Sequence, residues 1–534
     1  MATALTLHAN LGRNLRAGEV DANFVGVRDA ADAAVANAAA ALAAVSLVAP
    51  STSYYAAMPT GVAATDQATI TAAFASSANV VILQPGTYLL TDEIAWPTGK
   101  VLKANGPAGS VTLKRADGST NDYMFKAVNG AAGIGAEGIV FDANKRGCYS
   151  GNVLCGIFSA DTGNLASSTK WTDCTFYDTA QHYAVLLKDT SGHRFTRVRF
   201  DTALRCPIEL VGCSDVGFDS VTWTAYNTAA TTPTNPAIRF SCGTSDVPVS
   251  KVRFADCTWI NTVSDGFAIE AVADIAGRVF HSFGMTNCDL DANYKGGTGI
   301  SGALGRCTID NSRWTKGFPN NRCGLELAGD NNVVAGNVMV YESGLRTATY
   351  GSVIALTGNT NTGLLRSNKV QGNQISIVLT SNNLNGQIGG ISLYCQEDAE
   401  VSGNYIRFEV AGTAAGRVNA GVMMGTYGNA GPLRGCKVHD NTVVSTDIAN
   451  GSGFRLLTNT GANTGISGLN GIDYAVGLEV YNNTARGLYA GITLPSTTVD
   501  TSCTMVNNNL AGNGTAISGT AAGTGNTINS TYPR

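Results

Sequence analysis

The chain has 534 residues, of which 14% are charged, with 63 glycines and a formal net charge of −4. Typical proteins carry about 25% charged residues, so this composition favours a rigid all-β fibrous body over a disordered chain. The charge gives no basis for nucleic acid or an anionic membrane as a partner, and no window reaches the about 18 apolar residues of a membrane span, so we expect no membrane insertion.

Small and apolar residues between Val20 and Val45 follow a heptad pattern, with spacings that alternate between four and three. This pattern is typical of a coiled-coil seam and indicates parallel self-association, with a trimer as the expected form. The alternative is a single amphipathic helix that packs on its own domain. Pro50 ends the helix. We therefore assign residues 1–50 to an N-terminal segment with a coiled-coil helix. Its first residues contain no apolar signal core, so we expect synthesis in a host cytoplasm without a signal peptide.

A short helix followed by strands is predicted between Thr65 and Ile94. Thr65 or Asp66 can cap this helix at its start. Its apolar face contains Ile70, Ala73 and Phe74. A strand over residues 80–83 and the turn sequence PGTY follow. Because the open end of a stack of strands exposes core and strand edges, we expect residues 51–100 to form a cap.

One sequence frame recurs along the remainder of the chain at intervals of about 20–50 residues, which is typical of a solenoid. The frame VSGNYIRF begins at Val401 and has Asn404 at its fourth position. The same position is asparagine at Asn337, Asn373, Asn404, Asn441, Asn483 and Asn508. Upstream frames place cysteine or another small or apolar residue there, at Cys174, Val198, Val221, Cys257, Cys288 and Ser312.

Each unit also contains a second short strand, such as AVLL from Ala184, PIEL from Pro207 and GISL from Gly390. Helical patterns between the strands are absent, so the strands are predicted to stack as a parallel β-helix over residues 101–534. Equivalent residues of successive coils then lie about 4.8 Å apart. The asparagines are predicted to form a buried ladder in which each amide hydrogen bonds to the next. The alternative is that some of them are ordinary exposed turn residues.

Thirteen cysteines are present, with no CxxC motif and no Cys/His spacing that suits a metal, so we expect neither a metal nor another cofactor. Cys174, Cys257 and Cys288 occupy the ladder position and are predicted to be buried small apolar residues. Trp223, Trp259 and Trp314 share the position two residues later. Core stacking is the favoured interpretation for these tryptophans, and carbohydrate stacking is the alternative.

The pattern from Asp66 to Tyr88 resembles the start of the pectate-lyase-like right-handed parallel β-helix family. The sequence LRAGEVDANFVGVRDAADAAV, residues 15–35, looks like the virion-attachment segment of bacteriophage tail fibres and tailspikes. Together with the asparagine frames, nearly the whole chain is similar to a phage tailspike. The resemblance implies a right-handed, single-stranded β-helix that forms a homotrimer, attaches to phage baseplate or tail proteins through its N-terminal segment, and lies in the virion. It further implies a β-helix surface that binds, and often cleaves, bacterial surface polysaccharide.

Candidate functional residues come from the outward position of the second strand in each unit, the x of the pattern G-φ-x-φ, where φ is apolar. Read coil by coil, this position holds Leu186, Glu209, Arg239, Glu270, Ser301, Glu326, Ala355, Ser392, Met423, Arg455 and Thr493. We predict that Glu209, Glu270 and Glu326 are catalytic, with Asp265 as a further candidate, and that Arg239 and Ser301 bind substrate. Carboxylates two coils apart are about 9–10 Å apart at the backbone, near the separation that inverting glycosidases use. Arg239 could keep one neighbouring carboxylate ionised while the other carboxyl group acts as an acid.

Three functions fit this pattern. The first is an endo-acting glycoside hydrolase that depolymerises capsular or O-antigen polysaccharide. The second is a non-catalytic receptor-binding fibre with the same fold, in which the column is only a surface charge ladder. The third is a polysaccharide lyase, which the few Lys and Arg residues of the column disfavour.

Overall fold

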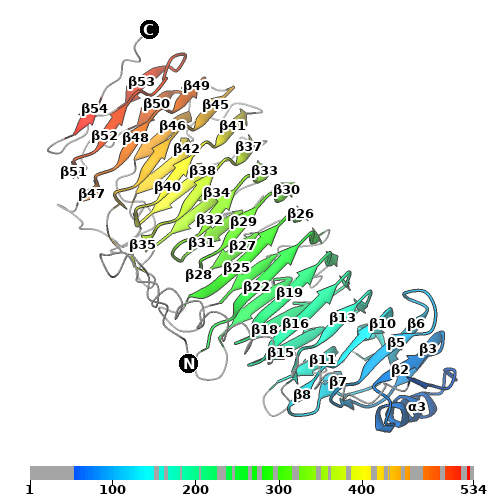
Figure 1. Cartoon of the computed structure of the whole chain (residues 1–534). Helices are drawn as coiled ribbons and strands as arrows, with labels where there is room; N and C mark the ends of the chain where they lie inside the picture. Colours follow the sequence, from blue (N-terminus) through cyan, green and yellow to red (C-terminus); the bar gives the residue numbers. More distant parts are fainter. Residues whose placement is uncertain are drawn as a thin grey trace, which may run out of the picture.

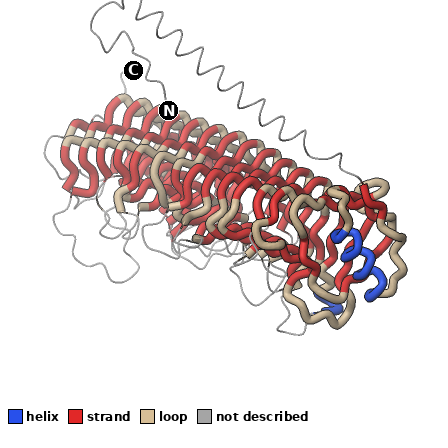
Figure 2. Tube along the Cα trace, turned by 60° about the horizontal axis from the view of Figure 1, so that its bottom comes forward, coloured by secondary structure: helices blue, strands red, loops and turns tan. Residues whose placement is uncertain are grey.

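The structure is a computed structural model of the chain, and it describes part of it. The described residues are 53–148, 155–161, 166–180, 183–203, 206–224, 236–242, 247–261, 268–272, 279–292, 299–315, 324–343, 350–358, 363–379, 387–410, 418–425, 431, 433–446, 451–456, 473–493, 499–518 and 526–528. The predicted coiled-coil helix therefore lies outside the described residues, and both that helix and the trimer stay predictions. The strands stack along one elongated body, with helix α3 at the end formed by the first described residues (Figures 1 and 2).

Three long sheets form the body, and every strand pair within them is parallel. Sheet A contains β1 (Ser53–Tyr55), β2 (Val80–Leu83), β5 (Val101–Ala104), β9 (Gly135–Glu137), β13 (Lys170–Thr172), β16 (Ser191–Thr196), β19 (Ser214–Asp219), β22 (Ser250–Ala255), β25 (Phe280–Thr286), β28 (Leu304–Gly305), β29 (Thr308–Asp310), β32 (Val333–Ala335), β36 (Lys369–Gln371), β40 (Glu400–Ser402), β44 (Lys437–His439), β48 (Glu479–Tyr481), β52 (Thr504–Val506) and β54 (Thr527–Ile528).

Sheet B follows sheet A along each coil. It contains β3 (Gly86–Leu90), β6 (Val111–Arg115), β10 (Ile139–Asp142), β14 (Thr175–Tyr177), β17 (Arg199–Asp201), β20 (Thr222–Thr224), β23 (Thr258–Asn261), β26 (Asp289–Ala292), β30 (Arg313–Thr315), β33 (Val338–Ser343), β37 (Gln374–Leu379), β41 (Tyr405–Val410), β45 (Thr442–Ser445) and β49 (Thr484–Arg486).

Sheet C completes each coil before the chain returns to sheet A. It contains β4 (Ile94–Trp96), β7 (Tyr123–Ala127), β11 (Gly156–Ala160), β15 (Val185–Lys188), β18 (Ile208–Val211), β21 (Ile238–Ser241), β24 (Ile269–Ala271), β27 (Ile300–Gly302), β31 (Leu325–Leu327), β34 (Tyr350–Thr357), β38 (Gln387–Tyr394), β42 (Val418–Gly425), β46 (Gly451–Leu456), β50 (Ala490–Thr493) and β53 (Thr515–Ser518).

Two small sheets lie at corners of the coils. They consist of β8 (Ala131–Ala132) with β12 (Ala166–Ser167), and of β35 (Leu365–Arg366), β39 (Gln396–Glu397), β43 (Leu433–Arg434), β47 (Asp473–Val476) and β51 (Val499–Thr501). The chain thus passes from A to B to C and back, with each strand paired to its equivalent in the next coil. The predicted all-β parallel β-helix is confirmed.

The predicted asparagine ladder is also confirmed. The Asn373 side chain accepts hydrogen bonds from the Asn337 backbone N–H at 3.0 Å and from Asn337 Nδ2 at 2.9 Å. Asn404 accepts the same pair of bonds from Asn373, at 3.0 and 2.9 Å. The pattern continues through Asn441, Asn483 and Asn508. All six side chains are at most 2% exposed, which excludes the alternative of surface turns.

The bend that carries the ladder has a simple backbone cause. The residue before each ladder position has a left-handed φ, as in Asp173 (φ 53°), Asn287 (φ 54°) and Gly336 (φ 65°). Glycine, asparagine and aspartate tolerate this conformation best, which explains why they precede the ladder residue in most frames. Upstream of the asparagines, Cys174 and Cys257 fill the same buried position as free thiols, as predicted.

The core beside the bend is an aromatic stack. Trp223 and Trp259 are fully buried, with ring centroids 4.5 Å apart and planes 8° apart. Phe200 stacks on the other side of Trp223 at 5.9 Å, and Trp314 is also fully buried. Core stacking is therefore confirmed for the tryptophans, and a role in binding sugars is wrong for them.

Helix α3 (Ala63–Ala75) packs on the first coil, and the much shorter α4 (Lys145–Cys148) follows β10. The predicted apolar face of α3 is buried, at Ile70, Ala73 and Phe74. The predicted cap is wrong, because the N-cap is Val62 and no side chain caps it. Asp66 lies in the first turn, fully buried, and accepts hydrogen bonds from the N–H groups of Thr60 at 2.7 Å and Leu89 at 3.1 Å. Its carboxylate thus joins the helix to β3 instead of capping the start of the helix.

Sheet A extends into the residues predicted as a cap, because β1 pairs with β2 and β2 with β5. The division of the chain into residues 1–50, 51–100 and 101–534 stays a prediction.

Candidate functional site

The outward column of sheet C forms in the predicted register. Glu209 pairs with Arg239, Arg239 with Glu270, Glu270 with Ser301, and Ser301 with Glu326. Neighbouring strands in a sheet lie about 4.8 Å apart, so these five residues form one continuous row. All five are partly buried, and all except Ser301, which is followed by Gly302, lie between two apolar residues of their strand that face the core.

The accessible polar part of the column ends at Glu326. The next three residues in register, Ala355, Ser392 and Met423, are 2%, 0% and 1% exposed. Met423 and Ala420 form a small apolar cluster with Tyr394 on this outer face, separate from the main core. A polysaccharide could therefore contact the column from Glu209 to Glu326 but not at the next three coils. The side chain of Arg455 lies outside the described residues.

Glu209 is held by two hydroxyl groups. Ser241 Oγ donates a hydrogen bond to Glu209 Oε1 at 2.8 Å. The Tyr183 hydroxyl also hydrogen bonds to Glu209, and burial together with the negative charge of Glu209 raises the pKa of Tyr183 above its usual value. Tyr183 is therefore a neutral phenol that donates to the carboxylate, and Glu209 is a fixed acceptor rather than a freely rotating surface group.

Arg239 lies between two carboxylates in the register. Burial lowers the pKa of Arg239, but Tyr183, Glu209 and Glu270 outweigh this effect and the net pKa is raised. The guanidinium therefore stays charged. Its Nε is buried, and no described residue accepts a hydrogen bond from it. A buried donor without a partner is costly, so Arg239 is held in place at a cost in stability.

Ser301 separates Glu270 from Glu326 and donates a hydrogen bond from its Oγ to Glu326 Oε2 at 2.9 Å. Its side chain is much smaller than that of Arg239, which lies between Glu209 and Glu270. The space between Glu270 and Glu326 is thus the less occupied of the two intervals. Each interval spans two coils, or about 9–10 Å between backbones.

One predicted site residue, Asp265, lies outside the described residues. Two contributors were not predicted. Ser241 could have been found, because it lies two residues after Arg239 and a strand returns to the same face at that spacing. Tyr183 precedes its strand at a corner, where strand alternation gives no direction for the side chain.

The described residues also bear on metal sites and membrane-spanning helices. There, no group of three or more His, Cys, Asp or Glu side chains is placed to hold a metal ion. In the same ranges, no helix has both the length and the apolarity needed to cross a bilayer.

The sequence matches no protein-family model and no curated protein. Among solved structures, the chain is similar to a surface adhesin of Streptococcus pneumoniae, PfbA, at 11% identity and a TM-score of 0.38, over 87% of this chain and 93% of the adhesin. It is similar to the Dettilon tailspike protein at 12% identity and a TM-score of 0.29, over 87% and 68% of the two chains. It is also similar to an alginate lyase at 12% identity and a TM-score of 0.41, over 86% of both chains. Similarities at this level carry no argument about activity.

Proposed function

We propose that the chain is a phage tailspike that binds bacterial surface polysaccharide, either capsule or O-antigen, and depolymerises it by glycosidic hydrolysis. The observation that supports this most is the row of Glu209, Arg239, Glu270, Ser301 and Glu326 in register on the outer face of sheet C. A row across five coils suits a long polymer, which binds at several successive points. Assignment to a phage virion rests on the resemblance of residues 15–35 to an attachment segment.

The proposed catalytic pair is Glu270 and Glu326. Inverting glycosidases hold two carboxyl groups about 6.5–9.5 Å apart, with a water molecule between the base and the sugar. The small Ser301 leaves room for that water, whereas Arg239 fills the interval between Glu209 and Glu270. Glu209 is then a binding and positioning residue.

The role of Glu270 follows from its neighbour Arg239, and Glu326 takes the remaining role. The positive charge of Arg239 favours the carboxylate form of Glu270, which a general base requires. Glu270 would remove a proton from water as the water attacks the anomeric carbon. Glu326, on the far side of Ser301, would donate its proton to the leaving glycosidic oxygen. The exposed part of the Arg239 guanidinium would donate a hydrogen bond to a sugar oxygen.

The two other functions give different results in one experiment, incubation of the protein with purified polysaccharides from a panel of bacterial hosts. Hydrolysis shortens the chains without new absorbance at about 235 nm, because no double bond forms. Lyase cleavage creates an unsaturated uronic end and that absorbance. A non-catalytic receptor-binding fibre binds without shortening the chains.

The same assay tests the site. E270Q and E326Q each keep the size and hydrogen-bonding shape of the side chain while removing its acid–base function, so each is expected to lower the cleavage rate by a factor of about 10²–10⁴. Glu479→Gln is the matched control, because this glutamate lies on sheet A, 3.6 Å from Lys437. Cleavage that survives both E270Q and E326Q would show that the column is not the catalytic site.

A further inference from the structure

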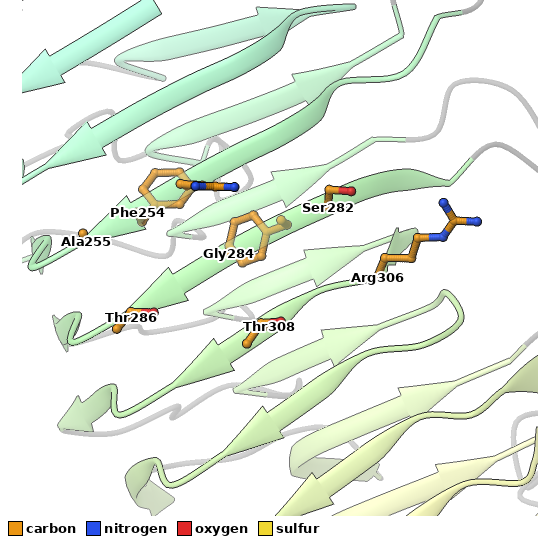
Figure 3. Close-up of a pocket in the computed structure, with 9 residues that line it drawn as sticks. Phe254, Ala255, Ser282, Gly284, Thr286, Arg306 and Thr308 are labelled. Atoms are coloured by element: carbon orange, nitrogen blue, oxygen red, sulfur yellow. The ribbon is translucent and has the colours of Figure 1, made fainter. Parts of the chain in front are cut away.

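The outer face of sheet A carries a depression that the column on sheet C does not include. Its volume is ≈ 370 Å³, and it lies across β22, β25 and the segment around β29 (Figure 3). Its polar lining and floor contain Arg253, Ser282, Gly284, Thr286, Arg306 and Thr308. Two guanidinium groups and three hydroxyl groups thus surround an open floor.

Strand register builds this arrangement. Arg253 pairs with Gly284, and Gly284 pairs with Thr308. A Cβ at Gly284 would lie 3.8 Å from Arg253 Cγ, which is an ordinary contact, and its φ is not in the left-handed region. Neither crowding nor backbone conformation therefore requires glycine here. Its effect is to leave the floor beside the Arg253 side chain open.

The two arginines differ from another arginine of the same sheet. Arg194 occupies the same outer column as Arg253, two coils away, and its Nη2 contacts both carboxylate oxygens of Asp215 at 2.8 and 2.9 Å. Within the described part of the chain, the guanidinium groups of Arg253 and Arg306 form no ion pair or hydrogen bond. Both side chains are exposed, so both positive charges are available to a ligand.

The charge of Arg306 acts on its neighbour His281. Burial lowers the pKa of His281, the positive charge of Arg306 lowers it further, and Asp330 opposes the change only in part. Asp310 is the partner of Thr286 in the register and accepts a hydrogen bond from that hydroxyl. The Thr286 hydroxyl is therefore already engaged by this carboxylate.

We propose that this depression is a subsite for an anionic substituent of the polysaccharide, a carboxylate, sulfate or phosphate group, with Arg253 and Arg306 as its ligands. Guanidinium groups form strong charge-assisted hydrogen bonds with such groups, and the hydroxyls of Ser282 and Thr308 supply further donors. The proposal rests on the proposed function for its ligand class, since it makes the polymer an acidic polysaccharide.

The depression lies on the same coils as the catalytic pair. Only Ala303 separates β27, which carries Ser301, from β28, which leads into Arg306. Five residues of extended chain span at most about 17 Å, so Arg306 is within that distance of Ser301. A polysaccharide that crosses the column on sheet C can therefore continue over this short corner to the arginines.

The test measures equilibrium binding of three defined probes by calorimetry: dextran, dextran sulfate and polygalacturonate. The wild-type chain is expected to bind one or both anionic probes, more weakly at higher salt, and not neutral dextran. R253Q combined with R306Q is expected to weaken that binding about tenfold or more, because each arginine loses a charge-assisted contact. R194Q is the matched control and is expected to change it less than about twofold. A preference for polygalacturonate or for dextran sulfate identifies a carboxylate or a sulfate ligand.

Equal binding by the wild type and the double variant would overturn the proposal, as would an equal loss in R194Q, which would show only diffuse surface charge. Circular dichroism of each variant checks that the fold is intact. Failure of the proposed function gives a different result: no host polysaccharide is bound or shortened, although Arg253 and Arg306 still bind the anionic probe.

Discussion

Replacing Asn404 by alanine tests the packing on which the whole body depends. The Asn404 side chain donates from Nδ2 to Val370 O at 2.9 Å and to Asn441 Oδ1 at 2.9 Å. Its Oδ1 accepts from the Asn373 backbone N–H at 3.0 Å and from Asn373 Nδ2 at 2.9 Å. Alanine removes all of these bonds and leaves buried polar groups above and below without their partners.

The size of the destabilisation follows from the hydrogen bonds that those polar groups lose. A buried donor without a partner costs about 1–3 kcal/mol, and each ordinary hydrogen bond contributes about 1 kcal/mol. Asn404→Ala is therefore expected to lower the local free energy of opening by about 3–5 kcal/mol. Each 1.4 kcal/mol is about a factor of ten, so hydrogen exchange of the surrounding amides should accelerate by about two to four orders of magnitude.

The assay is hydrogen–deuterium exchange with mass spectrometry on peptides that cover residues 401–408, with peptides from residues 80–90 as an internal reference. Asn508→Ala is the matched control, because Asn508 also accepts two bonds from Asn483 and donates to Val480 O but, among the described residues, donates to no further ladder asparagine. Its effect on the amides around it should be about three quarters as large, since it loses three bonds against the four counted for Asn404. Unchanged exchange over residues 401–408 in Asn404→Ala would refute the ladder as a source of stability.

Three further predictions concern the site, acid stability and packing. E326Q should abolish polymer shortening in a viscosity assay yet keep affinity within about threefold, whereas loss of affinity alone would make Glu326 a binding residue. His193 is buried, and burial lowers its pKa to about 4. In the unfolded chain the pKa of His193 is about 6.5. The contribution of the neutral, buried His193 to the free energy of unfolding is therefore complete above about pH 6.5 and declines by about 3 kcal/mol as the pH falls to about 4. Denaturant unfolding of His193→Asn should show less pH dependence than the wild type over that window, and equal slopes would contradict this. Gly389→Ala should destabilise by about 1–3 kcal/mol, because the new Cβ would lie 2.4 Å from Met423 Cε. Thermal unfolding of the double variant Gly389→Ala, Met423→Ala should show that part of the lost stability is recovered. No recovery would show that the destabilisation does not come from the contact with Met423.

The register of the column could be predicted from sequence because the fold repeats. Once Glu209, Arg239 and Glu270 occupy the same position of a recurring strand, stacking makes them neighbours whatever the intervening lengths. The asparagine ladder follows for the same reason. Both features come from short local patterns, and parallel stacking alone decides which residues of distant coils become neighbours.

Features that depend on individual tertiary contacts could not be predicted in this way. The sequence suggests Asp66 as a helix cap, but the residue lies inside the first turn, and its hydrogen bond to Leu89 N–H joins residues that no repeat relates. A second polar ladder, in which Asn368 accepts from the Asn332 backbone N–H and donates to Gln396, lies at the corner before sheet A. It mixes residue types and has few members, so no frame reveals it.

Burial of the outer face is the other feature that the pattern does not predict. Alternation indicates that Ser392 and Met423 point away from the core, and they do. It cannot indicate that this face is itself covered, so that both side chains are at most 1% exposed. The pattern therefore locates the column, and the structure limits its accessible polar part to the coils from Glu209 to Glu326.

The most direct test of the proposed binding row is a crystal structure of the E270Q variant with a fragment of the host polysaccharide that the wild-type chain binds. We predict sugar density across sheet C from Glu209 to Glu326, with a sugar oxygen within hydrogen-bonding distance of the Arg239 guanidinium and a glycosidic oxygen beside Glu326. Density confined to another face, with no sugar oxygen near Arg239, would contradict the account.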